Sequence, residues 1–365
     1  MRDLTALPKA HLHLHFTGSM RPDTLAELAE AKGVRLPAAL LDDDPLHVPG
    51  DARGWFRFQR LYDAARQVVR DEATMRRVNA ETVADDAAEG SVRLEIQVDP
   101  TSYAPHVGGI TPAVEIVLDA ARAASAAHGT EVGVIVAASR LRHPMDARTL
   151  ARLAARHAGS GPGEVVGFGL SNDERRGDTE AFGPAFAIAE RAGLALVPHA
   201  GELLGPAHVS EVLDCLHPHR LGHGVRSAED PRVLERVVRE QVVLEVCPAS
   251  NVSLGVYHQM ADVPLRALVE AGAQVALGAD DPLLFRSRLV DQYAAARDVL
   301  GLDDVALAGL ARSSVRASQA GATTQAAALA GIDAWLAGPA ASALVSQRGR
   351  SADRRPVPAV PTEAS

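Results

Sequence analysis

The stretch PKAHLHLHFTGSM, residues 8–20, places three histidines at every second position of a short apolar run. Side chains alternate between the two faces of a β-strand, so His11, His13 and His15 share one face if this run is a strand. Residues two apart on a strand lie ~6.6–6.8 Å from each other, which lets two imidazoles near a strand end converge on one metal ion. The run therefore predicts a strand with His13 and His15 as candidate ligands, while the deeper His11 belongs to the core or supports the ligands.

The composition indicates a protein with a large apolar core. The chain has 365 residues, of which 47% are apolar, and a formal net charge of −9. No Lys/Arg-rich block occurs, so we do not expect nucleic acid as a partner. We also expect no membrane span or signal peptide, because no apolar run approaches ~20 residues and the N-terminus lacks a charged segment before an apolar one. The two cysteines, Cys215 and Cys247, favour a reducing, cytoplasmic location.

Eight short β-rich runs alternate with Ala-, Leu-, Arg- and Glu-rich segments that are typical of helices. The candidate strands are 10–15, 92–98, 132–136, 165–170, 195–199, 220–223, 242–247 and 274–278. The candidate helices are 112–128, 146–158, 182–192, 209–215, 231–240 and 264–271. Such alternation implies parallel strands with right-handed crossovers. Eight units predict an α/β fold of the (β/α)8 (TIM) barrel type, in which chemistry takes place at the C-terminal ends of the strands.

Two segments depart from a minimal barrel. Residues 16–90 are too long for one crossover and predict a helical cap inserted after the first strand, with one helix at 53–69. Residues from about 319 to 344 are Ala-rich and predict a C-terminal helical extension. From residue 345 onward Ser, Arg and Pro are frequent, which predicts a disordered tail. We therefore expect a single catalytic domain over residues 1–344 and a tail over 345–365.

Polar motifs follow three more of the predicted strands. HAGE, with His199 and Glu202, ends the fifth strand, GHG, with His223, ends the sixth, and GADDP, with Asp280 and Asp281, ends the eighth. Each motif alone has an ordinary structural explanation, since a histidine can cap a turn and an Asp pair before proline is a good helix N-cap. Because all strand ends of a barrel meet at one rim, their coincidence instead predicts a shared site.

The predicted rim offers the ligands of a metal ion. Three imidazoles and a carboxylate suit Zn²⁺ with an open position for water, and they come from His13, His15, His199 and Asp280. Zinc lowers the pKa of bound water to near ~7, and His223 and Asp280 are the candidates to take its proton and orient it. Glu202 is the candidate proton donor, since a partly dry pocket raises the pKa of a carboxyl group. Asp281 is free to hydrogen-bond a substrate.

These motifs resemble those of the adenosine deaminases of the amidohydrolase superfamily. HLH, HAGE, GHG, DDP and the run CPASN after the seventh strand match in order and spacing over roughly residues 7–316. The resemblance implies a barrel with one Zn²⁺ per chain that replaces the 6-amino group of a purine with oxygen. It implies zinc on His13, His15, His199 and Asp280. It further implies that Glu202 is the proton shuttle at purine N1, that His223 orients the zinc water and that Asp281 binds N7.

Two positions depart from the pattern of that family. The family usually carries Leu-Asp-Gly or Leu-Glu-Gly after the second histidine, and in adenosine-specific members the acidic residue holds the ribose 5′-hydroxyl. Here Thr17 stands at that place, and Asn172 replaces a glycine whose backbone meets purine N3. Both changes alter the edge that meets the sugar, since Thr17 has no charge and Asn172 adds a side chain.

We therefore favour a 6-aminopurine nucleoside without an ordinary 5′-hydroxyl, such as 6-amino-6-deoxyfutalosine from the futalosine route to menaquinone. Its benzoate would need a cation. The cap offers four arginines, which otherwise form a solvated helix face: Arg53, Arg57, Arg60 and Arg66. Ordinary adenosine or adenine stays an alternative, because all these compounds present the same aminopurine edge.

Other classes of protein fit less well. A binuclear amidohydrolase usually needs a bridging lysine after the fourth strand, and VVGFGL (165–170) has none. A cytidine-type zinc deaminase needs a second cysteine after Cys247-Pro248, which is missing. A barrel that only binds nucleosides would be expected to lose a ligand or Glu202, yet all these positions are filled. The expected partners are a small 6-aminopurine nucleoside and water, and the sequence does not reveal the oligomeric state.

Overall fold

The computed structural model of the chain describes residues 1–339. Within them, eight parallel strands follow one another in chain order, and each is hydrogen-bonded to the next. Their bounds are β1 Lys9–His15, β2 Ser91–Val98, β3 Glu131–Ser139, β4 Val165–Ser171, β5 Ala195–Ala200, β6 Arg220–His223, β7 Val243–Val246 and β8 Val275–Leu277.

The segment after β8 closes the ring of strands against β1. His15 donates its backbone N–H to the carbonyl oxygen of Asp280 at 3.0 Å, and Asp280 donates its own to the carbonyl oxygen of His13 at 3.0 Å. The predicted (β/α)8 barrel is thus confirmed. Since all strands are parallel, their C-terminal ends lie at one rim.

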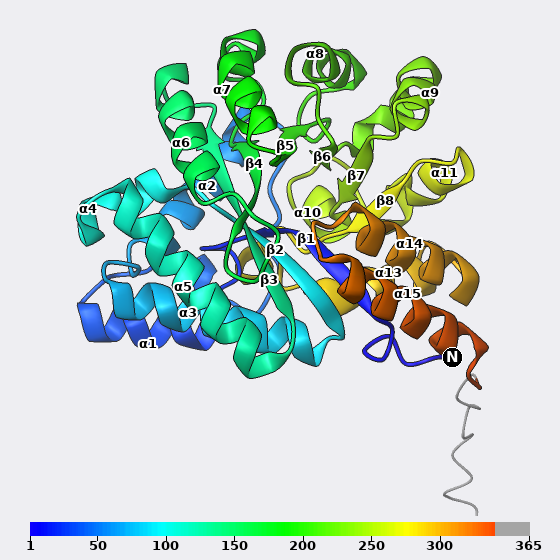
Figure 1. The fold of residues 1–365 in the computed structure, drawn as a ribbon, viewed down its shortest axis with the longest axis horizontal. Helices are drawn as coiled ribbons and strands as arrows, with labels where there is room; N and C mark the ends of the chain where they lie inside the picture. Colours follow the sequence, from blue (N-terminus) through cyan, green and yellow to red (C-terminus); the bar gives the residue numbers. More distant parts are fainter. Residues whose placement is uncertain (340–365) are drawn as a thin grey trace, which may run out of the picture.

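Helices surround the barrel (Figure 1). Those after β2 are α4 Ala104–Val107, α5 Ile110–His128, α6 Pro144–Arg156, α7 Thr179–Arg191, α8 Pro206–Leu216, α9 Pro231–Arg239, α10 Pro248–Ser253, α11 Leu265–Glu270, α12 Pro282–Phe285 and α13 Leu289–Asp298. Short 3-10 helices lie at η2 Pro100–Ser102, η3 Val225–Glu229 and η4 Met260–Asp262. Many of these helices carry proline in their first turn, where its missing N–H costs nothing. Of residues 1–339, no helix has the length and apolar character needed to cross a membrane.

The predicted cap lies between β1 and β2. It consists of α1 Pro22–Lys32, η1 Ala38–Leu40, α2 Ala52–Arg66 and α3 Glu72–Ala88. α2 begins after Asp51, whose carboxylate accepts the N–H groups of Arg53 and Gly54. Phe58 on the buried face of α2 stacks on Phe285 of α12 with ring centroids 5.7 Å apart. This contact holds α2 beside the C-terminal end of β8.

After α13 the chain forms α14 Asp304–Ala317, which packs against β1 and β8, and then α15 Ala322–Ala337, which lies in the predicted C-terminal extension (Figure 1). The N-terminus anchors α15, because the Arg2 side chain donates hydrogen bonds to the carbonyl oxygens of Trp335, Leu336 and Gly338. The predicted helix therefore exists, with narrower bounds than 319–344. Residues 340–365, with the predicted tail, lie outside the described residues.

Candidate active site

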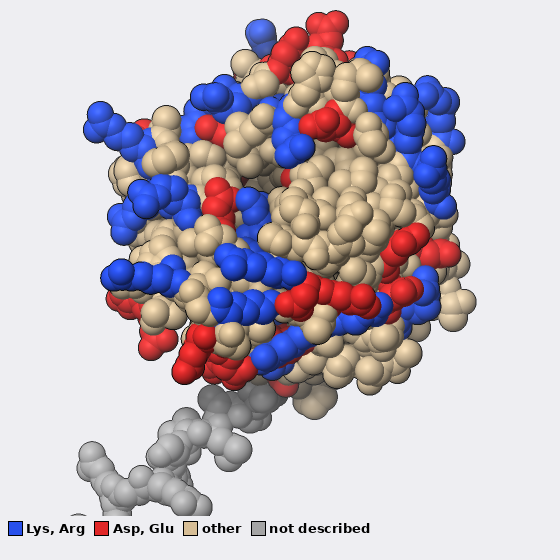
Figure 2. All heavy atoms as spheres, turned by 90° about the vertical axis from the view of Figure 1, so that its left-hand side faces the viewer, with Lys and Arg blue, Asp and Glu red and all other residues tan. Residues whose placement is uncertain are grey.

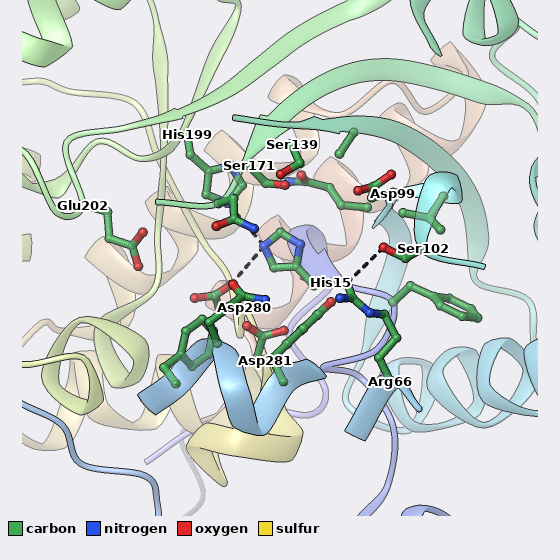
Figure 3. A pocket seen from close by; sticks show the side chains of 18 of the residues that line it. His15, Arg66, Asp99, Ser102, Ser139, Ser171, His199, Glu202, Asp280 and Asp281 are labelled. Carbon is green, nitrogen blue, oxygen red and sulfur yellow. Dashed lines mark hydrogen bonds and ion pairs between the residues drawn. The ribbon is translucent and has the colours of Figure 1, made fainter. Parts of the chain in front are cut away.

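A cavity of about 720 Å³, including its open mouth, lies at the C-terminal rim of the barrel beneath α2 (Figure 3). Its wall is formed by the ends of the strands and by the inner face of α2. The predicted site residues that line it are His15, Asn172, His199, Glu202, His223, Asp280 and Asp281. The cavity thus gathers side chains that are up to 266 positions apart in the chain. Such a concave site with a few convergent polar groups is the usual form of a small-molecule site.

The four predicted metal ligands meet at the floor of this cavity. His15 Nε2 lies 3.3 Å from His199 Nε2 and 3.2 Å from Asp280 Oδ1. His13 Nε2 lies 3.6 Å from the same carboxylate oxygen. Asp280 has a φ of +61°, a left-handed conformation that is uncommon outside glycine and is typical of functional sites.

The cluster fits a divalent metal ion. His13 Nε2 is buried and has no hydrogen-bond partner among the described residues. The donor atoms of His13, His15 and Asp280 all lie within 4.8 Å of one another, as do those of His13, His199 and His223. Nitrogen donors combined with a carboxylate suit Zn²⁺ and other first-row divalent ions. These His and Asp groups could therefore bind a metal.

The pKa shifts of His199 and Asp280 agree with that use, whereas the shift of His13 does not. Burial lowers the pKa of His13, but hydrogen bonds with the Asp280 and Glu245 carboxylates outweigh this and raise it to about 10, so a metal ion must displace a proton from this ring. Burial lowers the pKa of His199 well below its usual value, and the neighbouring histidines lower it further. Burial opposes ionisation of Asp280, yet hydrogen bonds with His13 and His15 hold the pKa of its carboxyl group well below the usual range. A neutral imidazole and an ionised carboxylate are the forms that bind metal ions.

Glu202 and His223 lie beside the ligands. His223 Nε2 is 3.4 Å from Glu202 Oε1 and 3.8 Å from Asp280 Oδ2, and its Nδ1 is 3.3 Å from Asn251 Nδ2. Burial raises the pKa of Glu202 well above its usual value, and the charge of Asp280 raises it further. Burial lowers the pKa of His223 to about 3. Burial therefore favours the protonated form of Glu202 and the uncharged form of His223.

Asp281 presents a second buried carboxyl group to the cavity (Figure 3). Its Oδ1 has no hydrogen-bond partner within the described part of the chain. Burial raises the pKa of Asp281 well above its usual value, and the adjacent Asp280 adds to the effect. A protonated Asp281 can donate a hydrogen bond to a ring nitrogen of a substrate.

The two positions that depart from the family pattern differ in their placement. Asn172 lines the cavity with a φ of +82°, a conformation that glycine adopts freely and that asparagine tolerates better than most residues. Thr17 is fully buried behind the wall, and its hydroxyl lies 2.6 Å from the Tyr103 hydroxyl. Tyr103 lines the cavity. Thr17 can therefore act on a substrate through Tyr103.

The four cap arginines also differ in their position relative to the cavity. Arg66 reaches the cavity, donates to Ser102 Oγ at 3.0 Å and pairs with Asp63. In Figure 3 it lies on the far side of His15 from Glu202. Arg57 and Arg60 line a separate depression on the outer side of α2, and Arg53 lies in its exposed first turn.

Sequence reasoning missed two buried acidic residues that support the site. Glu174 accepts the backbone N–H groups of Glu202 at 3.0 Å, Leu203 at 2.9 Å and Leu204 at 2.7 Å. Glu245 of β7 lies 2.8 Å from His13 Nδ1. The available signal was an acidic residue inside an otherwise apolar strand, as in VVLEVC (242–247).

The fold and the site together define a (β/α)8 barrel whose rim carries metal-binding and acid–base groups. The chain matches the family model described as adenosine deaminase over residues 8–335. A protein of Streptomyces virginiae, provisionally named adenosine/adenine deaminase, is 60% identical over 338 residues, which cover 92% of this chain and 99% of that protein.

Two solved structures are similar over nearly the whole chain. The crystal structure of adenine deaminase from Arthrobacter aurescens has a TM-score of 0.82 and 30% identity, and the match covers 91% of this chain and 100% of that chain. Arabidopsis ADAL complexed with IMP has a TM-score of 0.80 and 25% identity, covering 91% and 97%. The chain therefore belongs to the adenosine deaminase family, and it is a hydrolytic deaminase.

Proposed function

We propose that the chain catalyses zinc-dependent removal of the 6-amino group of an adenine compound, with oxygen from water taking its place and ammonia leaving. The observation that carries this proposal is the position of Glu202, a buried carboxyl group with a raised pKa beside the cluster of candidate metal ligands. The similarity to named adenosine and adenine deaminases supports a 6-aminopurine as the substrate.

The zinc ion would be held by His13, His15, His199 and Asp280. When bound, zinc lowers the pKa of a coordinated water and so supplies a nucleophile near neutral pH. Glu202 holds a proton where it can be given to purine N1, which makes the neighbouring C6 more electrophilic. His223 turns Nε2 toward Glu202 and Asp280, where it orients the attacking water. Asp281, whose pKa is raised by burial, would donate a hydrogen bond to N7 and fix the plane of the ring.

Within this class we favour a nucleoside with a modified, negatively charged 5′ end, such as 6-amino-6-deoxyfutalosine. Arg66 supports this proposal, because a substrate held by Glu202 at one end would extend toward the guanidinium at the other (Figure 3). A guanidinium pairs well with carboxylate or phosphate. Asn172 and the Tyr103 hydroxyl, which contacts Thr17, would also shape the wall of the cavity. Arabidopsis ADAL, complexed with the 5′-phosphate IMP, is a related barrel with such a ligand.

Free adenine is the second candidate. The similarity of the chain to adenine deaminase from Arthrobacter aurescens supports this candidate. The pairing of Arg66 with Asp63 also favours it, since the guanidinium already has a carboxylate partner without a substrate anion.

A substrate panel tests these candidates. Zinc-loaded protein is offered adenine, adenosine, AMP and 6-amino-6-deoxyfutalosine, and deamination is followed by ultraviolet absorbance. We expect kcat/KM for an anionic 5′ compound to exceed that for adenosine about 10- to 100-fold, the range of a charge-assisted hydrogen bond. Arg66→Met should remove this preference, whereas Arg57→Met, on the outer side of α2, should keep it. A preference for adenine or adenosine would end the 5′ proposal, and inertness toward all four compounds would end the proposed reaction.

Three broader expectations stay predictions. We propose one catalytic domain over residues 1–344, which the family match over 8–335 supports. A reducing cytoplasmic location is supported by Cys215 and Cys247, which are both unpaired within residues 1–339. A small molecule, rather than nucleic acid, as the partner is supported by the face in Figure 2, where basic and acidic side chains are mixed.

A further inference from the structure

Two histidines of β1 make the same contact with a buried carboxylate. His11 Nδ1 lies 2.8 Å from Asp86 Oδ1, and His13 Nδ1 lies 2.8 Å from Glu245 Oε2. All four side chains are at most 1% exposed. The two rings differ at their other nitrogen. His11 Nε2 is 3.0 Å from the backbone nitrogen of Ala279, whereas His13 Nε2 has no partner among the described residues and faces the ligand cluster.

The contact with Ala279 fixes the tautomer of His11. A backbone N–H can only donate, so Nε2 of His11 must accept, and the ring proton sits on Nδ1 and is donated to Asp86. The matching carboxylate at His13 selects the same tautomer. That tautomer leaves the lone pair of Nε2 free, which a metal ligand requires.

Glu245 is itself held on both of its oxygens. While Oε2 faces His13, Oε1 accepts a hydrogen bond from Arg220 Nε at 2.6 Å. The other nitrogens of Arg220 donate to Glu95 Oε2 at 2.7 Å and to the carbonyl oxygen of Ala317 at 2.8 Å. Glu95 in turn accepts the backbone N–H of Gln319 at 2.6 Å. These hydrogen bonds form a network that links β1 to β7, β6 and β2, and then to the end of α14. If Glu245 turned away from His13, its hydrogen bond with Arg220 would break as well.

We propose that Glu245 is a positioning residue of the metal centre. It holds His13 in the tautomer and ring orientation that aim Nε2 at the metal ion, and Arg220 braces Glu245 from the barrel interior. This inference rests on the proposed metal-dependent function. It makes metal affinity depend on a residue, Glu245, that is not itself a proposed metal ligand.

The experiment compares Glu245→Gln with Asp86→Asn. Each variant replaces a carboxylate that contacts a histidine of β1 by the amide of the same shape, but only His13 is a proposed ligand. Zn²⁺ alone is the probe, and its dissociation constant is measured by competition with a chromophoric chelator. Circular dichroism and thermal unfolding without added metal report folding. We expect Glu245→Gln to raise the Zn²⁺ dissociation constant about 10- to 100-fold. Asp86→Asn should leave it within about twofold of the parent, even where it lowers the unfolding temperature.

Each outcome bears on the proposal. A folded Glu245→Gln variant that binds Zn²⁺ as tightly as the parent overturns it, and so does an equal loss of affinity in both variants, which would reflect a general loosening of β1. If Glu245→Gln does not fold, Glu245→Asp takes its place, because the shorter side chain withdraws the carboxylate from His13 while keeping the charge beside Arg220. Weakened binding then supports the proposal and unchanged binding overturns it. A parent protein without Zn²⁺ affinity would instead refute the proposed function itself.

Discussion

Gly18 and Asp281 are in such close contact that a Cβ atom on Gly18 would lie 1.7 Å from Asp281 Oδ1 and 2.7 Å from Asp281 Cβ. The second distance is decisive, because a Cβ atom cannot be moved by rotating the side chain. The loop after β1 is therefore packed directly on the residue that we propose to bind purine N7.

Gly18→Ala should consequently displace Asp281 and weaken substrate binding. We expect kcat/KM to fall at least ~10-fold, mostly through KM, because a hydrogen bond from a buried polar group is lost or misplaced. The measurement is steady-state kinetics on the best substrate of the panel. Gly309→Ala is the control, since nothing lies within 4 Å of a Cβ at Gly309 in α14. That variant should keep parent kinetics and gain about 0.5–1 kcal/mol of stability. Parent kinetics in Gly18→Ala would contradict the assignment of Asp281.

Glu202→Gln should bind zinc and yet lose most of its turnover. The amide has the size of the carboxyl group but cannot transfer a proton, and general acid–base catalysis is worth about 10²- to 10⁴-fold. In the parent, activity should also fall as pH rises through the raised pKa of Glu202, because the ionised form has no proton to give. Turnover and bound zinc are measured on the same preparation. The control is Glu211→Gln, a change at an exposed carboxylate of α8. Near-normal turnover in Glu202→Gln would remove Glu202 from its role.

Glu174→Gln should slow turnover without loss of zinc. The Glu174 carboxylate accepts three consecutive backbone N–H groups, from residues 202–204, and an amide keeps only one acceptor oxygen. A hydrogen bond to a charged group is worth ~1.5–3 kcal/mol, so we expect kcat to drop about 10- to 100-fold as Glu202 shifts. Glu164→Gln is the matched control, because Glu164 likewise accepts a backbone N–H, that of Gly161, in a loop at the opposite end of β4. Equal kinetics in the two variants would show that the loop is held by other contacts.

The barrel, and the gathering of the candidate ligands at its rim, could be predicted because their signals are local. An alternation of two residues marks His13 and His15 on one face of a strand, and eight short apolar runs separated by helical segments leave few topologies other than a barrel. The bounds of two helices were less accurate, one of them in spite of a stop signal, since Gly338-Pro339 directly follows the last helix. The helix expected at 53–69 ends at Arg66 in the structure, and that expected at 319–344 spans Ala322–Ala337.

Contacts between distant residues were not predictable from motifs. Thr17 contacts Tyr103, 86 positions away, so its hydroxyl is bonded to a side chain that lines the cavity. Of the four cap arginines, Arg66 lines the cavity because of the way α2 packs on the barrel rim. Its neighbours in the sequence did not indicate this. Glu245 stands out as an acidic residue inside the apolar run 242–247, but its partner His13 lies 232 positions away, so the contact between them could not be predicted.

Stability of the chain should depend on pH through His208 of α8, a buried histidine without hydrogen-bond partners among the described residues. Burial lowers the pKa of His208 to about 4, and the nearby Arg140 adds to the effect. In the unfolded chain its pKa is ~6.5, so between these values the unfolded state binds more protons. The contribution of His208 to the free energy of unfolding is therefore fully present above about pH 6.5. It is lost as the pH falls toward 4, which lowers the free energy of unfolding by roughly 3 kcal/mol in total.

His208→Leu should remove that part of the pH dependence. The free energy of unfolding is measured by urea denaturation at several pH values from 7.5 to 4.5, and the variant should lose less stability over this range than the parent. His258→Leu serves as the control, because His258 is exposed and its substitution should leave the parent profile in place. Glu174, whose Oε2 lies 3.7 Å from His208 Nδ1, is present in all three proteins. A variant with the same pH profile as the parent would mean that the fold opens around His208 before the ring is protonated.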